Sequence, residues 1–254
     1  MILTLDMGNT NIVLGCIDDN DNMTCRARIM TDKRKTESEY AVILKSIFDI
    51  GGVVADDITG VAVSSVVPPL NEVIRRAVKT VTACDALFIT VDSDTGLKIN
   101  VDNPRQVGND LLVAAVAALD IAPPPLIIID MGTATTITAV DKGGTFCGTA
   151  IMPGVEISLS ALSSGTSQLP YIELDAPAGV IGKNTVDSMK SGVIYGAAAM
   201  LDGMIDRMAE TMEGTPHVIA TGGLSKLVVP YCRHRILCDE DLILKGLKIL
   251  YYKN

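Results

Sequence analysis

Two copies of the tripeptide Asp-Met-Gly are the part of this sequence best suited to chemistry. Asp6-Met7-Gly8 and Asp130-Met131-Gly132 each follow a short apolar run and precede a small polar turn. A carboxylate at the end of a buried strand suits hydrated Mg²⁺, a hard cation that prefers oxygen ligands. Glycine lets a backbone approach phosphate closely, and the amides of a tight turn form an anion-binding nest. The two turns therefore predict a site for a nucleotide phosphate chain.

Uncharged hydrogen-bond donors lie beside both turns. Asn9, Thr10 and Thr133 can donate to β- and γ-phosphate oxygens, and Thr221-Gly222-Gly223 is expected at a helix start near the adenosine. The sequence contains neither G-x-x-x-x-G-K-[ST] nor G-x-G-x-x-G, so it supports neither a P-loop nor a simple dinucleotide fold. We expect the two turns to face each other and to hold a triphosphate from both sides.

The two tripeptides belong to a longer internal repeat. Residues 2–14 and 127–140 both run from an apolar segment through Asp-Met-Gly and a polar turn into β-branched residues, and their aspartates are 124 positions apart in a chain of 254. This pattern is typical of a strand, a tight turn and a second strand. The alternative is two unrelated hairpins that share a tripeptide by chance. We interpret the repeat as two similar domains, residues 1–124 and 125–254, which meet near Pro123-Pro124-Pro125.

Helical and strand patterns alternate through the rest of the chain. Helices are predicted over residues 37–49, 70–82, 107–121 and 185–213, and strands over 58–67 and 86–91. Residues 217–225 are typical of a strand that turns through two glycines into a helix. The predicted fold class is α/β.

Composition and charge narrow the function further. The chain is 48% hydrophobic and 20% charged, which excludes wholesale disorder, and it has no unbroken apolar stretch long enough to span a membrane. Its beginning does not resemble a signal peptide, and its six cysteines form no C-x-x-C pair, so we expect reduced thiols and a cytoplasmic location. A net charge of −9 disfavours nucleic acid and anionic lipid as partners. The short basic run Lys33-Arg34-Lys35 is expected on a solvated loop.

An ordered set of motifs extends this pattern over most of the chain. Its segments are Asp6-Met7-Gly8-Asn9-Thr10-Asn11, Ser64-Ser65-Val66-Val67-Pro68, Asn103-Pro104, Val107-Gly108-Asn109-Asp110, Asp130-Met131-Gly132-Thr133-Ala134-Thr135-Thr136, Ile151-Met152-Pro153-Gly154, Thr166 with Leu169-Pro170, Gly182-Lys183-Asn184-Thr185, Ser191-Gly192 and Thr221-Gly222-Gly223. In this order they resemble the actin-like ATPase and sugar/acetate kinase superfamily, in particular the type III pantothenate kinases. The resemblance implies two ribonuclease H-like domains, with flanking helices, around a nucleotide cleft.

The resemblance also implies an activity, the phosphorylation of pantothenate by ATP in the first step of coenzyme A synthesis. Asp110 would be the proton acceptor that orients the substrate hydroxyl, which is reasonable for a carboxylate that opens an apolar helix after Gly108. The alternative interpretation of Asp110 is an acid at a helix N-terminus with no catalytic role. The family likewise implies a homodimer, with ATP and pantothenate as the ligands.

Residue by residue, the resemblance implies three binding sets. The ATP set is Asp6, Met7, Gly8, Asn9, Thr10, Asn11, Ile12, Val13, Gly132, Thr133, Gly222 and Gly223; the pantothenate set is Gly108, Asn109, Asp110, Leu111 and Thr185. Asp6 would hold Mg²⁺ through water, and Asp130 a monovalent cation, K⁺ or NH₄⁺. Thr185 is equally plausible as a helix N-cap, and Gly8, Gly108 and Gly132 as simple turn glycines.

Two positions depart from the family pattern on the substrate side. Leu111 stands where the family has Arg after the catalytic Asp, and Val101 stands where it has Tyr before Asn-Pro. Loss of the Arg removes a cation that would pair with a carboxylate or with developing phosphate charge, and Arg105 is a candidate replacement. The alternatives are a kinase of the same fold that acts on another small alcohol or carboxylate, and a nucleotide-binding regulatory protein without turnover.

Overall fold

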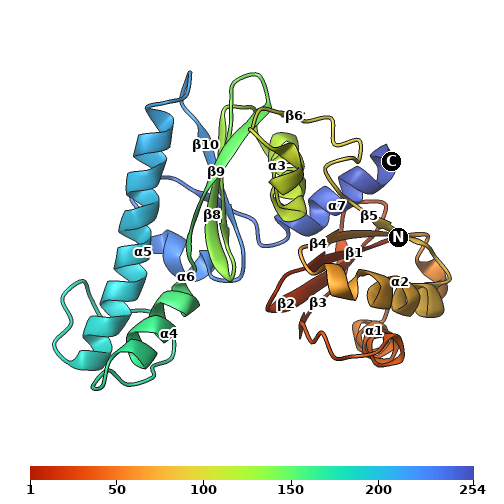
Figure 1. The fold of residues 1–254 in the computed structure, drawn as a ribbon, viewed down its shortest axis with the longest axis horizontal. Helices are drawn as coiled ribbons and strands as arrows, with labels where there is room; N and C mark the ends of the chain where they lie inside the picture. Colours follow the sequence, from red (N-terminus) through yellow and green to blue (C-terminus); the bar gives the residue numbers. More distant parts are fainter. The chain divides into compact units, whose positions relative to one another are not determined.

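Both Asp-Met-Gly tripeptides lie where a central strand meets a tight turn, in two sheets of matching strand order. Figure 1 draws the strands and helices of the chain. The computed structural model describes residues 1–254, which form two compact units. Unit 1 comprises Met1–Leu97, Asp102–Ala117 and Asp241–Asn254, and unit 2 comprises Lys98–Val101 and Ala118–Glu240.

Unit 1 is built on a five-stranded sheet of order β3-β2-β1-β4-β5. Its strands are β1 (Ile2–Met7), β2 (Asn11–Ile17), β3 (Met23–Met30), β4 (Gly60–Ser65) and β5 (Ala86–Phe88). Its helices are α1 (Glu37–Gly51), α2 (Pro68–Thr82), the first turns of α3 (Asn109–Ile121) and α7 (Leu242–Lys253), with 3₁₀ turns at Ala55–Asp57 and Pro104–Gln106. The strand β1 runs antiparallel to β2 and parallel to β4.

The two faces of this sheet are covered by different helices. Leu3, Leu5 and Met7 alternate along β1 and pack under α1 and α2, through residues such as Leu44 and Ile74. This alternation is what a strand with one face on a core requires. The helix α7 covers the opposite face and contacts β1 and β4. The central strand β1 is therefore buried on both sides, which explains its continuous apolar run.

Unit 2 is built on a six-stranded sheet of order β11-β10-β7-β8-β9-β6. Its strands are β6 (Lys98–Ile99), β7 (Leu126–Met131), β8 (Ala134–Val140), β9 (Thr145–Pro153), β10 (His217–Thr221) and β11 (Leu237–Cys238). Its helices are α4 (Val155–Gly165), α5 (Thr185–Ala209) and the four-residue α6 (Ser225–Val228), followed by a 3₁₀ turn at Val229–Tyr231. Ile127, Ile129 and Met131 on β7 pack with α4 and α5.

The internal repeat predicted from the sequence is confirmed strand by strand. The order β3-β2-β1-β4-β5 of unit 1 corresponds to β9-β8-β7-β10-β11 of unit 2, with the same parallel and antiparallel pairings around the central strand. The second copy has a shorter turn, because two residues separate β7 from β8 and three separate β1 from β2. The two hairpins therefore share their whole strand arrangement, and not a tripeptide alone.

The division into units differs from an equal split at residues 124 and 125, because the C-terminal helix α7 belongs to unit 1. Gly246 allows close packing of α7 on α3, since a Cβ there would meet the Val113 carbonyl oxygen at 2.5 Å. Leu244 and Tyr251 pack beside Gly15 and Gly60 of the sheet. This apolar face makes α7 part of the first core rather than of the second.

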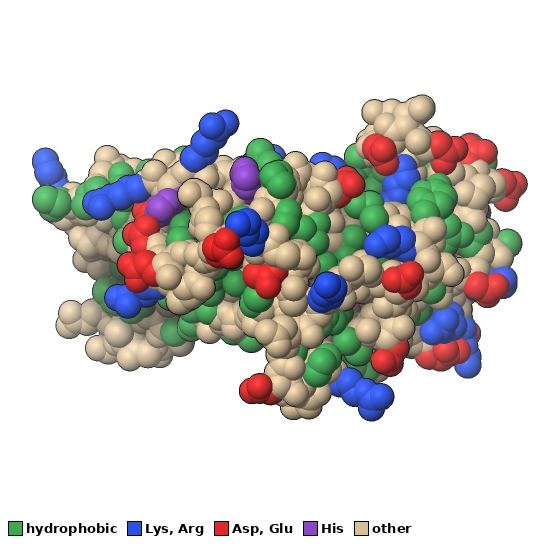
Figure 2. Space-filling view, turned by 90° about the horizontal axis from the view of Figure 1, so that it is seen from above, with side chains coloured by type: hydrophobic (Ala, Val, Ile, Leu, Met, Phe, Trp, Pro, Cys, Tyr) green, Lys and Arg blue, Asp and Glu red, His purple; other side chains and the backbone are tan.

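No helix is both long and apolar enough to cross a membrane. All six cysteines are free thiols, and no cluster of three or more His, Cys, Asp or Glu side chains is arranged to hold a metal ion. On the face drawn in Figure 2, Lys and Arg side chains are interspersed with Asp and Glu side chains.

Candidate active site

The first turn, defined here as Gly8, Asn9 and Thr10, connects β1 to β2. The Gly8 N–H donates to the Asn11 carbonyl oxygen at 2.9 Å and closes the turn. The Met7 and Ile12 side chains are buried in the core, so only their backbone groups face the turn, whereas Asn9 and Thr10 are exposed. Among the predicted ATP-binding residues of this unit, Met7 and Ile12 thus hold the turn in the core, and Asn9 and Thr10 lie on the surface.

The start of helix α3 lies at the same sheet edge as the first turn. The Asn109 side-chain amide donates to the Ser65 carbonyl oxygen at 3.1 Å, and Ser65 is the ladder partner of Met7. The Val66 N–H donates to the Met7 carbonyl oxygen at 3.0 Å, and the Ser65 hydroxyl donates to Asn71 at 2.6 Å. Asp6, the first turn and Asp110 therefore all lie near the C-terminal ends of β1 and β4 in unit 1.

Asp110 is held in a defined and half-buried position. Its Oδ1 accepts the Leu111 N–H at 2.9 Å, and it lies in the first turn of α3. Burial raises the pKa of the Asp110 carboxyl above its ordinary value of 3.8, an effect opposed by the hydrogen bond from the Leu111 N–H. A half-buried carboxylate with a raised pKa is a better proton acceptor than an exposed one.

The second turn, Gly132 and Thr133, connects β7 to β8 in unit 2. The Gly132 N–H donates to the Ala134 carbonyl oxygen at 3.0 Å. Asp130 precedes this turn, and its ladder partners are Thr136 on β8 and Thr221 on β10. Unit 2 therefore brings Asp130, the second turn and the end of β10 together.

Gly222, which directly follows β10, packs against Asp130 and Met131 at the end of β7. It has φ +89°, and a Cβ there would meet Asp130 Oδ1 at 2.5 Å and the Met131 backbone at 2.6 Å. Only glycine combines this backbone conformation with this approach. The Gly222 carbonyl oxygen accepts both the Ser225 N–H at 3.1 Å and the Ser225 hydroxyl at 2.8 Å. Gly222 is thus fixed against the acidic end of β7.

Two buried hydroxyls beside the acids have no hydrogen-bond partner. Ser64 Oγ lies next to Asp6 in the ladder between β1 and β4, and Thr136 Oγ1 lies next to Asp130 in the ladder between β7 and β8. Ladder partners share a sheet face, so each hydroxyl is on the same side as its acid. An oxygen-rich donor set of this kind fits Mg²⁺ or K⁺, which prefer oxygen ligands.

Comparison with known proteins decides the family. A family model described as type III pantothenate kinase matches residues 2–207. A protein named type III pantothenate kinase from Halalkalibacterium halodurans is 42% identical over 254 residues and covers 100% of both chains. One of the same name from Pelobacter propionicus is also 42% identical over 254 residues, with 100% of both chains covered. This chain belongs to the type III pantothenate kinase family.

Solved structures with lower sequence identity share this fold. A ROK family glucokinase from Streptomyces griseus, solved with glucose and AMPPNP, has TM-score 0.53 at 15% identity and covers 99% of this chain and 100% of its own. The activator of 2-hydroxyisocaproyl-CoA dehydratase from Clostridium difficile, with bound ADPNP, has TM-score 0.57 at 12% identity and covers 99% and 93%. The predicted fold class, two similar actin-like α/β domains, is confirmed.

The N-cap interpretation of Thr185 is wrong. Asn184 is the N-cap of α5, and its side-chain oxygen accepts the Asp187 N–H at 2.9 Å. Thr185 is the first helical residue and is exposed. Its predicted contact with pantothenate remains a prediction, as do the roles of Gly223, Asn11 and Val13.

The structure shows supporting contacts for residues to which the sequence analysis gave no role of their own. Ser65 and Asn71 hold the end of β4, and Ser64 and Thr136 flank the two acids. The signal was present as hydroxyl residues at strand ends, in Ser64-Ser65 and in Thr135-Thr136. Their ladder partners could not be assigned from the sequence, because strand register is a tertiary property.

Proposed function

We propose that the protein transfers the γ-phosphoryl group of ATP to the terminal hydroxyl of pantothenate and forms 4′-phosphopantothenate and ADP. This reaction is the first step of coenzyme A synthesis. The observation that carries the proposal is the duplicated acidic hairpin with its glycine turn, in a chain that belongs to the type III pantothenate kinase family. Backbone amides in both turns are the proposed ligands of the phosphate oxygens.

In the proposed reaction, Asp110 accepts the proton of the substrate hydroxyl. The hydroxyl oxygen forms a bond to the γ-phosphorus, the bond from that phosphorus to the β-bridging oxygen breaks, and ADP leaves. The hydroxyl proton passes to the Asp110 carboxylate, whose hydrogen bond from the Leu111 N–H holds its orientation. Positioning of the reactants contributes most of the rate, as is general for phosphoryl transfer.

Two cations fit the oxygen donors of the chain. We assign the water-mediated Mg²⁺ contact to Asp6, with Ser64 beside it, and the monovalent cation, K⁺ or NH₄⁺, to Asp130 with Thr136 beside it. Bound cations of this kind neutralise charge on the phosphates. Asp6 and Asp130 would hold these cations in defined positions, because each lies at the end of a central strand.

The protein is further proposed to act as a cytoplasmic homodimer. Support comes from exposed apolar side chains on α4, on the following loop and at the start of α5, including Tyr171 (80% exposed) and Ile181 (84% exposed). Light scattering on a size-exclusion column measures the mass directly. A monomer at micromolar concentration would contradict the dimer without affecting the proposed reaction.

A second candidate function is phosphorylation of another small alcohol or carboxylate. It is favoured by Leu111, which follows Asp110 directly and is half-buried and apolar where the family carries a cation. The Arg105 side chain is exposed in the 3₁₀ turn Pro104–Gln106, close in sequence to Asp110, and is the candidate replacement. Arg105→Ala is expected to raise the KM for pantothenate with little change in the KM for ATP. If neither the KM for pantothenate nor the turnover changes, Arg105 has no role in acceptor binding.

A coupled ADP-release assay tests the proposed function directly. Purified protein is given Mg²⁺-ATP with K⁺, NH₄⁺ or Na⁺, and pantothenate is compared with a panel of small alcohols and carboxylates. Pantothenate-dependent ADP release, with 4′-phosphopantothenate identified by mass, is the expected result. Faster release with another acceptor would favour the second candidate. ATP-dependent thermal stabilisation without product from any acceptor would indicate a regulatory protein instead.

A further inference from the structure

Thr31 contacts the first turn through both its backbone and its side chain. It follows β3 directly, its hydroxyl donates to the Gly8 carbonyl oxygen at 2.7 Å, and its N–H donates to the Thr10 carbonyl oxygen at 2.9 Å. Two carbonyl groups of a three-residue turn are thus bound to one residue. None of the motifs in the sequence pointed to this position.

These two hydrogen bonds set the direction in which the turn presents its amides. A trans peptide unit is planar, so its C=O and the following N–H point in opposite directions. Because the Gly8 carbonyl is held toward Thr31, the Asn9 N–H is directed to the side of the turn away from Thr31. An amide donor fixed before the ligand arrives needs no reorganisation when an anion binds.

The segment after Thr31 is itself anchored to the first core. The Tyr40 hydroxyl donates to the Asp32 carbonyl oxygen at 3.0 Å and accepts the Asp32 N–H at 3.1 Å, and Tyr40 is fully buried on α1. The Asp32 carboxylate binds Arg34 and Lys35, and the hydrogen bonds from Arg34 lower the pKa of this carboxyl to about 2. This segment therefore attaches Thr31 to helix α1.

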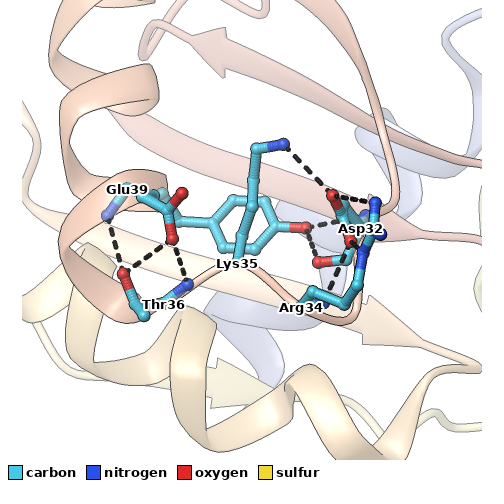
Figure 3. A network of polar contacts seen from close by, with 6 residues as sticks. Asp32, Arg34, Lys35, Thr36 and Glu39 are labelled. Carbon is cyan, nitrogen blue, oxygen red and sulfur yellow. Dashed lines mark hydrogen bonds and ion pairs between the residues drawn. The ribbon is translucent and has the colours of Figure 1, made fainter.

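The N-terminus of α1, which follows this segment, is capped. Thr36 and Glu39 form a capping box, in which the Glu39 carboxylate accepts the Thr36 N–H at 2.8 Å (Figure 3). A capping box fixes the entry of the chain into the helix. Hydrogen bonds thus join the first turn to Thr31, the Asp32 backbone to Tyr40 of α1, and Thr36 to Glu39 at the start of α1.

The same position contacts the turn in unit 2. Gly154 follows β9 as Thr31 follows β3, since Asn11 pairs with Met30 and Ala134 pairs with Pro153. A Cβ on Gly154 would collide with the Thr133 carbonyl oxygen and meet the Gly132 carbonyl oxygen at 2.7 Å. The residue after the third strand therefore lies against the turn carbonyls in both units, through a hydroxyl in one and through bare backbone in the other.

We propose that Thr31 is a positioning residue for the nucleotide, which orients the first turn so that its amides bind the phosphates of ATP. The inference rests on the proposed function only in that ATP is the ligand. Loss of the hydroxyl removes one of the two bonds that orient the turn and leaves the turn sequence intact.

The test compares Thr31→Val with Thr31→Ser and with the control Thr24→Val. Valine keeps the branched shape without the hydroxyl, and serine keeps the hydroxyl. Thr24 lies on β3, the strand that Thr31 follows, and its hydroxyl likewise donates to a carbonyl oxygen, that of Cys16 at 3.0 Å, away from the turn. The Kd for Mg²⁺-ATP is measured by calorimetry without pantothenate, and the KM values and kcat by the ADP-release assay.

Thr31→Val is expected to raise the Kd and the KM for ATP about fivefold, the effect of one net hydrogen bond, with kcat at saturating ATP and the KM for pantothenate changed less than about twofold. Thr31→Ser is expected to restore most of the affinity, and Thr24→Val to match the wild type. Equal ATP affinity in Thr31→Val and wild type would overturn the inference, and so would an equal loss in Thr24→Val. If the wild type binds no Mg²⁺-ATP, the proposed function itself fails.

A second variant keeps the inference testable if Thr31→Val does not fold. Tyr40→Phe removes the hydroxyl that anchors Asp32 and leaves the ring in the core. It is expected to raise the Kd for Mg²⁺-ATP in the same direction by about twofold to fivefold. An unchanged Kd in a folded Tyr40→Phe protein would contradict the anchored path from α1 to the turn.

Discussion

Gly108 lies so close to Asp110 that a Cβ at position 108 would collide with Oδ1 of Asp110. The same carboxylate oxygen accepts the Leu111 N–H at 2.9 Å. The side chain of Asp110 is thus confined between a backbone donor on one side and a bare Cα on the other. Gly108, which the sequence places in the substrate-binding set, has a mechanical role in fixing the orientation of the proposed base.

Gly108→Ala is expected to lower kcat while the fold is retained. The colliding atom is the end of a flexible side chain, so the carboxylate is displaced and the backbone stays in place. A displaced base loses part of the contribution of general base catalysis, and we expect a loss of about 10-fold to 100-fold in kcat. Steady-state kinetics and thermal unfolding measure the two effects separately.

Gly192→Ala is the matched control for this variant. Gly192 lies inside α5, where a Cβ meets nothing within 4 Å, so the substitution is expected to leave kcat unchanged and to stabilise the helix slightly. Wild-type kcat in Gly108→Ala would show that the orientation of Asp110 is not set by this contact.

Asp110→Asn is expected to fold, to bind Mg²⁺-ATP with the affinity of the wild type, and to lose at least about 100-fold in kcat. The amide preserves the size of the side chain but cannot accept the hydroxyl proton. The exposed Asp120, at the other end of α3, provides the control Asp120→Asn, which should keep wild-type turnover. Turnover near the wild-type value in Asp110→Asn would remove Asp110 from the mechanism.

The raised pKa of Asp110 predicts opposite pH dependences for activity and for stability. The base must be ionised, so kcat/KM is expected to fall as the pH decreases through the folded-state pKa, which lies above 3.8. The protonated form is the one that burial tolerates. The stabilisation that protonated Asp110 contributes to the free energy of unfolding is therefore complete below pH 3.8. It is lost as the pH rises through the folded-state pKa of Asp110.

Chemical denaturation of the wild type and of Asp110→Asn over a range of pH measures this contribution. Asparagine carries no charge to bury, so the variant is expected to be the more stable protein at neutral pH, with the difference in unfolding free energy shrinking toward acid pH. A difference that is constant with pH would mean that burial does not perturb Asp110.

The hairpins were predictable from the sequence because their signals are local. The apolar run before Asp6, the polar turn and the β-branched run after it determine a strand, a turn and a strand without reference to the rest of the chain. The same holds for Asp130. The predicted helix over residues 37–49 is α1, whose ends are marked by the Thr36 capping box and by Gly52 at φ +67°.

The tertiary partners of these elements were not predictable in the same way. Nothing local in Thr31 or Ser64 indicates which strand end it will face, because that depends on the register between strands. The packing of α7 in unit 1 depends on Gly246 meeting α3, a contact between segments more than a hundred residues apart. The candidate site was therefore visible as a set of motifs, and its supporting contacts only in the folded chain.

Gly222→Ala is expected to displace the end of β7 and the second turn that follows it. Alanine would carry the strain of a positive φ and would also press against Asp130 Oδ1 and the Met131 backbone, which is rigid. Strain of this kind costs about 1–3 kcal/mol of unfolding free energy. We expect a lower Tm together with a loss of at least about 10-fold in affinity for Mg²⁺-ATP, measured by calorimetry.

Gly144→Ala is the control that separates backbone strain from the collision with Asp130 and Met131. Gly144 also has a positive φ of +77°, but a Cβ there meets nothing within 4 Å, so this substitution carries the backbone strain without the collision. Gly144 lies in the turn between β8 and β9 and has no proposed role in binding. Its variant is expected to lose stability and to keep the wild-type Kd for ATP. Equal ATP affinity in both variants would mean that the approach of Gly222 to Asp130 supports the fold alone and does not shape the phosphate site.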